Sequence, residues 1–241
     1  IKTNENLGFG RANNLGMRYA LDNGCDYVFL LNQDTWIEKD SMAKLVEVAD
    51  KNPEYAIVSP MQIAANEKHL QFMIDDGNQN YEFLSDLYFK TLKEIYSVKY
   101  VNAAAWLLPR KTLENIGGFC PIIFHYGEDD DYLHRVLYHG YKVGIVPDSR
   151  IIHDCGVRLC ESDTYAKRAN WDDIDTLLDI NNNQSISAIR RHLAWKRFIS
   201  WLRRSKRQYE YYSHRYHIVR KNQKQIEECR EAHKIKQSNW L

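Results

Sequence analysis

Four consecutive acidic residues, Glu128 to Asp131, stand directly before a helical pattern in the sequence. Apolar residues recur four apart behind them, so the acids occupy the first turn of a predicted helix. A helix N-terminus favours negative charge. Four carboxylates in a row exceed that need, because like charges repel and push at least one pKa upward. Two interpretations stay open, a reactive carboxylate cluster or a charged helix start in which Asp131 pairs with Arg135.

A second acidic position follows an unbroken apolar run of strand length, Tyr27 to Leu31, which ends abruptly at Asn32. Ligands of open parallel sheets bind just beyond the carboxyl ends of strands. Asp34 is therefore well placed for a metal ion or a phosphate group, although an aspartate that caps the next helix is the alternative. His153 follows a later strand pattern, where a lone histidine is more often a buried, hydrogen-bonded residue than a ligand.

Strand-like apolar runs alternate with helical patterns along the first two thirds of the chain. Strands are predicted at 27–31, 55–59, 100–108 and 142–146, and helices at 41–51, 84–95 and 111–116. This alternation predicts an α/β, Rossmann-like domain with a mostly parallel sheet over residues 1–160. The usual first strand-helix-strand unit is absent before the first of these elements. The domain is thus expected to be N-terminally incomplete.

Composition and the lack of targeting signals indicate the cell compartment in which the protein is expected. The 241 residues are 44% hydrophobic and contain no apolar run long enough to span a membrane, nor a secretory signal at the start. The five cysteines form no C-x-x-C pair, which favours reduced thiols over a zinc site. These features predict a cytoplasmic protein.

The net charge of +1 hides a strong asymmetry between body and tail. Residues 187–241 hold 15 lysines and arginines against 4 acids, whereas residues 1–186 hold 18 against 28. A helical basic extension is predicted over 161–241, with Ile186, Leu193 and Leu202 on one face. Such a helix can lie on an anionic membrane. Alternatively its apolar face packs on the body or pairs two subunits as a homodimer, and the acidic body argues against nucleic acid as a partner.

The ordered set of motifs resembles a known family. The motifs are NENLGFGRANNLG at 4–16, LLNQDT at 30–35, NAAAWLLPRKTLENIGGF at 102–119, GEDDDYLHRVLYHGYK at 127–142 and IIH at 151–153. Together they resemble an inverting family 2 glycosyltransferase with the GT-A fold, especially the bacterial rhamnosyltransferase-like branch that builds surface polysaccharides. The resemblance covers about two thirds of the chain and leaves the tail unexplained.

The resemblance implies roles for the acidic positions. Its metal motif falls on Asn32-Gln33-Asp34, so Asp34 is expected to bind Mg²⁺ or Mn²⁺, while Asn32 departs from the motif and lies on the donor side. Its catalytic motif falls on Glu128-Asp129, so Asp129 is the expected general base. The neighbouring acids should raise the pKa of Asp129 and the helix N-terminus should lower it, and the sequence does not decide between them.

Further roles follow from the same resemblance. Glu128, Asp131 and Arg135 are expected to support the base. His153 matches a residue that meets the metal or the donor diphosphate, and an imidazole suits Mn²⁺ better than Mg²⁺. The remaining matches are Gly8 and Asn14 on the donor side and Trp106 beside the acceptor.

The implied activity is metal-dependent, inverting transfer of a hexosyl or rhamnosyl group from a nucleotide-sugar donor. The acceptor is a saccharide or a lipid-linked saccharide in cell-surface polysaccharide synthesis, at the inner face of the membrane. The rival interpretation is a catalytically incomplete module that binds nucleotide sugars or acts as a membrane-associated scaffold.

Overall fold

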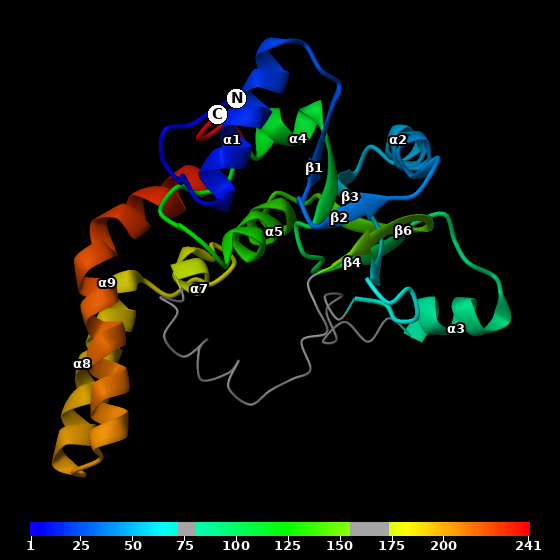
Figure 1. The fold of residues 1–241 in the computed structure, drawn as a ribbon. Helices are drawn as coiled ribbons and strands as arrows, with labels where there is room; N and C mark the ends of the chain where they lie inside the picture. Colours follow the sequence, from blue (N-terminus) through cyan, green and yellow to red (C-terminus); the bar gives the residue numbers. More distant parts are fainter. Residues whose placement is uncertain (72–80, 155–173) are drawn as a thin grey trace.

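The structure, a computed structural model, describes residues 1–71, 81–154 and 174–241. A mixed sheet carries helices on both faces, and a helical hairpin extends from one side of this body (Figure 1). The strands are β1 (Tyr27–Leu31), β2 (Thr35–Ile37), β3 (Tyr55–Ala64), β4 (Tyr96–Val98), β5 (Ala105–Pro109) and β6 (Lys142–His153). The helices of the body are α1 (Phe9–Asp22), α2 (Ser41–Lys51), α3 (Tyr81–Phe89), α4 (Arg110–Asn115), α5 (Glu128–Tyr138) and α7 (Ile174–Leu178).

The sheet has the strand order β1-β5-β3-β6-β2, and β4 also pairs with β6. Only β3 and β6 pair in parallel among the described strands, so the prediction of a mostly parallel sheet is wrong. The cause lies in β5, which separates β1 from β3 and runs opposite to both. The chain leaves β3 at Ala64 and enters β5 at the same edge of the sheet, so β5 has to run back across it. An apolar run in a sequence carries no strand direction.

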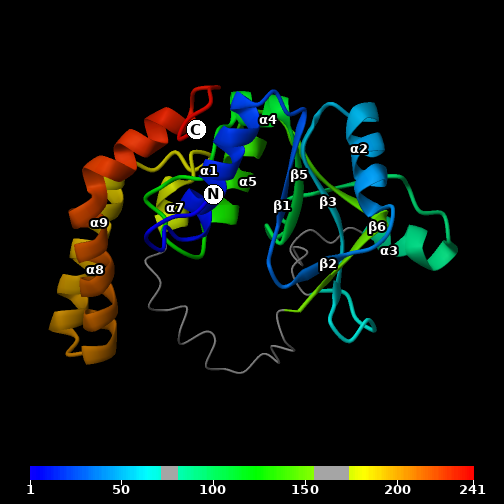
Figure 2. The same cartoon turned by 45° about the horizontal axis from the view of Figure 1, so that its top comes forward.

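The alternation of side chains along β5 separates two hydrophobic cores. Trp106 and Leu108 face the side of α1 and α5, together with Met17, Phe119 and Tyr132. Leu107 faces the other side, where α2 contributes Leu45, Val48 and Ala49. Figure 2 shows α2 on one face of the sheet and α1 and α5 on the other. Helices cover both faces of the sheet. A binding site is therefore expected at the ends of the strands.

The C-terminal part consists of α8 (Ile186–Leu202) and α9 (Lys206–His233), which pair as an antiparallel hairpin. Buried residues of the hairpin share a third core with Cys120 and Ile123 of the body. Beyond α9 the chain returns to the body, where Gly118 N donates to Asn239 O at 2.8 Å. The predicted boundary at residue 160 lies outside the described residues. In the parts of the chain described, no helix has the length and apolar character needed to cross a membrane.

The packing of the segment that follows α9 can be tested by substitution of Gly117, which contacts it. This residue has φ +82°, and a Cβ built on it would lie 2.3 Å from Asn239 O. Gly140 has a similar φ of +79° but nothing within 4 Å of a Cβ, so it is a matched control. We expect Gly140→Ala to cost about 1–2 kcal/mol of unfolding free energy through backbone strain alone. Gly117→Ala should cost roughly 1–3 kcal/mol more, because overpacking adds to the strain.

Urea unfolding of both variants measures this difference. Equal losses of stability in Gly117→Ala and Gly140→Ala would show that the returning segment does not rest on Gly117.

Candidate active site

Two predicted metal ligands meet where β2 and β6 pair. Thr35 is opposite His153 in the antiparallel register of these strands. The register brings His153 Nε2 to 3.5 Å from Asp34 Oδ1. The imidazole is buried, whereas the side chain of Asp34 is 44% exposed. Asp154 N donates to Asp34 O at 2.9 Å, which fixes the loop that carries the carboxylate. The pair thus offers one nitrogen and one accessible carboxylate.

The expected base, Asp129, lies in the first turn of α5. The Tyr100 hydroxyl donates to Asp129 Oδ2 at 3.1 Å, and Asp130 N donates to Asp129 Oδ1 at 3.1 Å. Burial raises the pKa of Asp129 above its ordinary value, while these hydrogen bonds act in the opposite direction. The pKa of Asp129 is therefore raised by desolvation, which outweighs the donors around the carboxylate, and not by the neighbouring acids that the sequence suggested.

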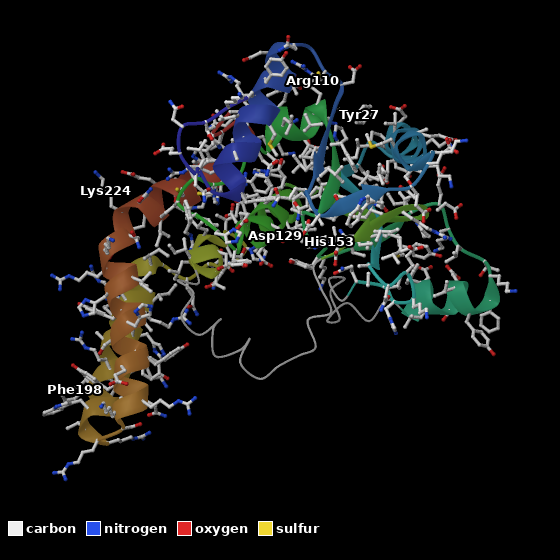
Figure 3. All side chains as sticks on the ribbon, in the orientation of Figure 1. Tyr27, Arg110, Asp129, His153, Phe198 and Lys224 are labelled. Atoms are coloured by element: carbon white, nitrogen blue, oxygen red, sulfur yellow. The ribbon has the colours of Figure 1, made fainter. Side chains whose placement is uncertain are left out.

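Small residues before β5 join the two acidic positions. The backbone of Ala103 hydrogen-bonds to Asp129, and Asn32 N donates to Ala104 O at 2.9 Å. Asn32 in turn accepts from Thr35 N at 3.2 Å, next to Asp34. In the view of Figure 3, Asp129 at the start of α5 and His153 at the end of β6 are both on the lower side of the body. Asp34 and His153 thus lie at the carboxyl ends of β1 and β6, and backbone contacts through Ala103 and Ala104 connect their loop to Asp129 of α5.

Glu128 lies beside the base in a different environment. Its side chain is buried, and Oε2 has no hydrogen-bond partner among the described residues. Burial, followed by the negative charge of Asp129, raises the pKa of Glu128 to about 7. Glu128 and Asp129 are therefore two adjacent carboxyl groups with raised pKa values, an arrangement common at functional sites.

Asp131 and Arg135 form the predicted i,i+4 pair, away from the site. Arg135 Nε lies 3.1 Å from Asp131 Oδ2, and both side chains are 1% exposed. The guanidinium also donates to Ile116 O and Gly118 O, each at 2.8 Å. His233 of α9 packs behind them, with Nδ1 3.5 Å from Asp131 Oδ1. These residues can support the base only by holding α5, since neither side chain reaches solvent.

Three residues expected to contact substrates have structural surroundings instead. Trp106 is fully buried and stacks on Phe119, which contradicts its prediction as a residue bordering the acceptor. Asn14 is 7% exposed, and its side-chain amide exchanges hydrogen bonds of 2.9 and 2.7 Å with the backbone of Phe119, so the amide cannot also bind a donor. Gly8 precedes α1 with φ +77°, and a Cβ there would lie 2.2 Å from Phe124 O. The lack of a side chain at Gly8 therefore allows the backbone of Phe124 to approach closely.

Sequence reasoning missed one residue that holds the expected base and one that packs behind α5. Tyr100 holds the Asp129 carboxylate, and His233 packs against Asp131. Neither lies within a helical or strand spacing of its partner, so no periodic signal could reveal them. The run of small residues at Ala103 to Ala105 was the available clue, because it permits a close approach of other groups.

The fold defines the class of protein. The crystal structure of GalNAc-T7 with UDP, GalNAc and Mn²⁺ has a TM-score of 0.54 to this chain at 14% sequence identity. The likeness covers 100% of this chain and 43% of that one. A shared arrangement at such low identity concerns the fold alone, and that fold is the GT-A glycosyltransferase fold.

Sequence comparison then shows which family the chain resembles. The model of "Glycosyl transferase family 2" matches residues 1–117, just under half of the chain. The dTDP-rhamnosyl transferase RfbF of Shigella flexneri is 23% identical over 158 residues, which are 64% of this chain and 52% of RfbF. The chain thus spans about half the length of this relative. These matches bear out the predicted resemblance to family 2, and Asp129 lies beyond the range that the family model matches.

The raised pKa of Glu128 predicts how stability depends on pH. The folded protein binds the proton of Glu128 more tightly than the unfolded chain, so stability falls as pH rises from about 4.5 to about 7. Glu128→Gln removes that charge and keeps the shape. We expect this variant to melt at least roughly 2–4 °C above the original protein at pH 8, because each 1 kcal/mol of unfolding free energy shifts the melting temperature by about that much in a chain of this size.

At pH 4.5 the two proteins should melt together, because Glu128 is then protonated in the folded state. A difference in melting temperature that is the same at both pH values would contradict the shifted pKa. Glu38→Gln, at an exposed position just after β2, serves as the control for the loss of a glutamate charge.

Proposed function

We propose that this protein is an inverting, metal-dependent glycosyltransferase that moves a hexosyl group, a rhamnosyl group in the first place, from a nucleoside-diphosphate sugar. The acceptor is a hydroxyl group of a saccharide or lipid-linked saccharide in cell-surface polysaccharide synthesis, at the cytoplasmic face of the membrane. The family match of residues 1–117 and the likeness to a dTDP-rhamnosyl transferase support the donor class. The observation that carries the proposal is the link from Asp129, through the backbone of Ala103 and Ala104, to the loop of the Asp34–His153 pair.

Transfer of a sugar to an acceptor hydroxyl requires a general base next to that hydroxyl. A sugar hydroxyl is a weak nucleophile, so a carboxylate must take its proton as the oxygen attacks the anomeric carbon. Asp129 accepts that proton, while the bond between the anomeric carbon and the diphosphate oxygen breaks. The diphosphate leaves with the electron pair. A single displacement by a hydroxyl opposite the leaving group inverts the anomeric configuration.

The surroundings of Asp129 suit this role. A raised pKa makes the carboxylate a stronger base than a solvated aspartate. Tyr100 donates to one oxygen and the backbone of Asp130 to the other, so the carboxylate is held in one orientation. Tyr100 is thus a positioning residue. The first turn of α5 fixes the position of the Asp129 carboxylate relative to the sheet.

The residues present fit a divalent cation that also binds the donor. Asp34 and His153 supply one carboxylate oxygen and one imidazole nitrogen, a set that suits Mn²⁺ better than Mg²⁺. No group of three or more His, Cys, Asp or Glu side chains stands ready for a metal in the described ranges. Donor phosphates and water would therefore complete the coordination. When bound, the ion would supply positive charge beside the departing diphosphate.

Asp129→Asn tests the base. The amide keeps the shape of the side chain but cannot take a proton, so turnover should fall by about 10²- to 10⁴-fold with little change in donor binding. Asp130→Asn, the same change one residue along α5, should keep most of its turnover. Release of the nucleoside diphosphate from dTDP-rhamnose or a UDP-hexose, with and without acceptor saccharides, measures the rate.

Retained turnover in Asp129→Asn would move the base to Glu128, since Asp131 is engaged with Arg135. Binding of nucleotide sugars by the original protein without turnover of any donor would instead favour the binding module.

Asp34→Ala tests the metal site. Loss of the carboxylate should abolish the increase in melting temperature that dTDP or UDP gives together with Mn²⁺. Asn32→Asp should enlarge the increase, because it adds a charged ligand at the same loop. His153→Ala should weaken Mn²⁺ binding more than Mg²⁺ binding, because a nitrogen ligand is lost.

Asp22→Ala is the control for a removed carboxylate, because this residue ends α1 and pairs with Arg18. Nucleotide binding and activity that survive EDTA would contradict the metal assignment.

A further inference from the structure

The helical hairpin of α8 and α9 uses only part of its apolar surface for packing. Ile186 and Leu193 of α8 are buried against Val219 and Ile226 of α9. One alternative for the apolar face of this helix was packing within the protein. The buried residues show that the inner face of α8 packs in this way. Figures 1 and 2 show the hairpin extending away from the sheet, with the turn between α8 and α9 at its far end.

The outer side of α8 near this turn is aromatic and exposed. Trp195, Phe198, Trp201 and Leu202 are 59%, 47%, 62% and 55% exposed. The rings form a continuous row, since Trp195 and Phe198 have centroids 6.0 Å apart and Phe198 and Trp201 have centroids 6.1 Å apart. Spacings of three residues place the row on one side of the helix. A contiguous apolar patch of this kind marks an interaction surface.

The charge beside the row is of one sign. Helix α8 contains four basic residues and no acidic residue. Arg203, Arg204, Lys206 and Arg207 follow at the turn and are all exposed. From Ile186 to Ile226 the sequence holds one acid, Glu210. We call the exposed residues 195–207 the hairpin tip.

A hollow of about 330 Å³ opens between the two helices at this tip. Trp195 and Tyr212 line it together with the cationic residues Lys196 and Arg203 and the amide of Gln208. Cationic groups and hydrogen-bond donors suit a phosphate group, and the indole suits the boundary between headgroups and acyl chains.

The charge decides which partner fits. A second copy of the chain packed tip to tip would bring two arginine-rich tips together, with only Glu210 close behind each to offset them, and this repulsion opposes pairing. An anionic bilayer offers phosphates to the cationic residues and an apolar interior to the aromatic row at the same time. We propose that the hairpin tip binds anionic membranes, with Trp195, Phe198 and Trp201 at the acyl boundary and Arg203 to Arg207 at the phosphates. This inference is independent of the proposed transfer reaction.

Sedimentation of the full chain with vesicles tests the proposal. The vesicles contain phosphatidylcholine alone or with about one third phosphatidylglycerol, at low and at raised salt. We expect binding to the anionic vesicles only, weakened by salt because exposed charges are screened. The variant Trp195→Ser/Phe198→Ser/Trp201→Ser should lose at least tenfold in affinity. Arg203→Glu/Arg204→Glu should lose about fivefold or more for each charge removed.

Matched controls come from elsewhere on the surface. Leu87→Ser/Phe89→Ser removes two exposed apolar side chains of α3, and Lys39→Glu/Lys68→Glu reverses two exposed charges of the body. Both should bind vesicles like the original protein. All substituted residues are exposed, so circular dichroism and melting temperature should be unchanged in every variant.

Three results would overturn the proposal. They are equal binding to neutral and anionic vesicles, unchanged binding of the aromatic variant, and a dimer in light scattering that the aromatic variant converts to a monomer. The last result would assign the tip to a second copy of the chain. Addition of soluble glycerol phosphate separates a phosphate site from a membrane surface, because only the former is blocked by it.

Discussion

The buried guanidinium of Arg135 is the constraint on which the arrangement around the site depends. A buried charge must be paired and hydrogen-bonded, because it has lost its hydration. Arg135 meets this need with Asp131 and with two carbonyl groups at the turn before Phe119, and it lies over the rings of Tyr132 and Trp240. One side chain thus joins α5, the turn and the C-terminal segment. Since α5 carries Asp129, the place of the base is set from the interior of the protein.

Local features of the fold could be predicted because a few neighbouring residues determine them. The strand Tyr27–Leu31 and the helix Ser41–Lys51 have the predicted bounds, and Asp131 pairs with Arg135 within one helix. Strand direction and strand length could not be predicted in this way. Pro147 suggested an end at residue 146, yet β6 continues to His153. The pairing with β3 skips residues 147–149 in a register shift, which accommodates the proline.

In the candidate site, too, local features could be predicted from the sequence and tertiary ones could not. Asp34, Asp129 and His153 were placed by motif, and the structure brings Asp34 and His153 to one another through the register of β2 and β6. Burial was the part that sequence could not supply. Trp106 and Asn14 look like exposed polar or aromatic contacts in a motif, but the packing of α1 on the turn at Phe119 encloses both. A motif identifies positions, whereas the tertiary packing decides which of them reach solvent.

The meeting of the turn at Phe119 with the C-terminal segment has a consequence for synthesis on the ribosome. Cys120 and Cys229 are 109 residues apart in the chain, and their sulfur atoms lie 3.5 Å apart. At translation rates of about 5–20 residues per second, Cys120 waits roughly 5–20 s for the synthesis of Cys229. Cys120 and Ile123, which share a core with the hairpin, stay open to other chains during that interval. The nascent protein should therefore engage chaperones late in its elongation, after the sheet has formed and before α9 has left the exit tunnel.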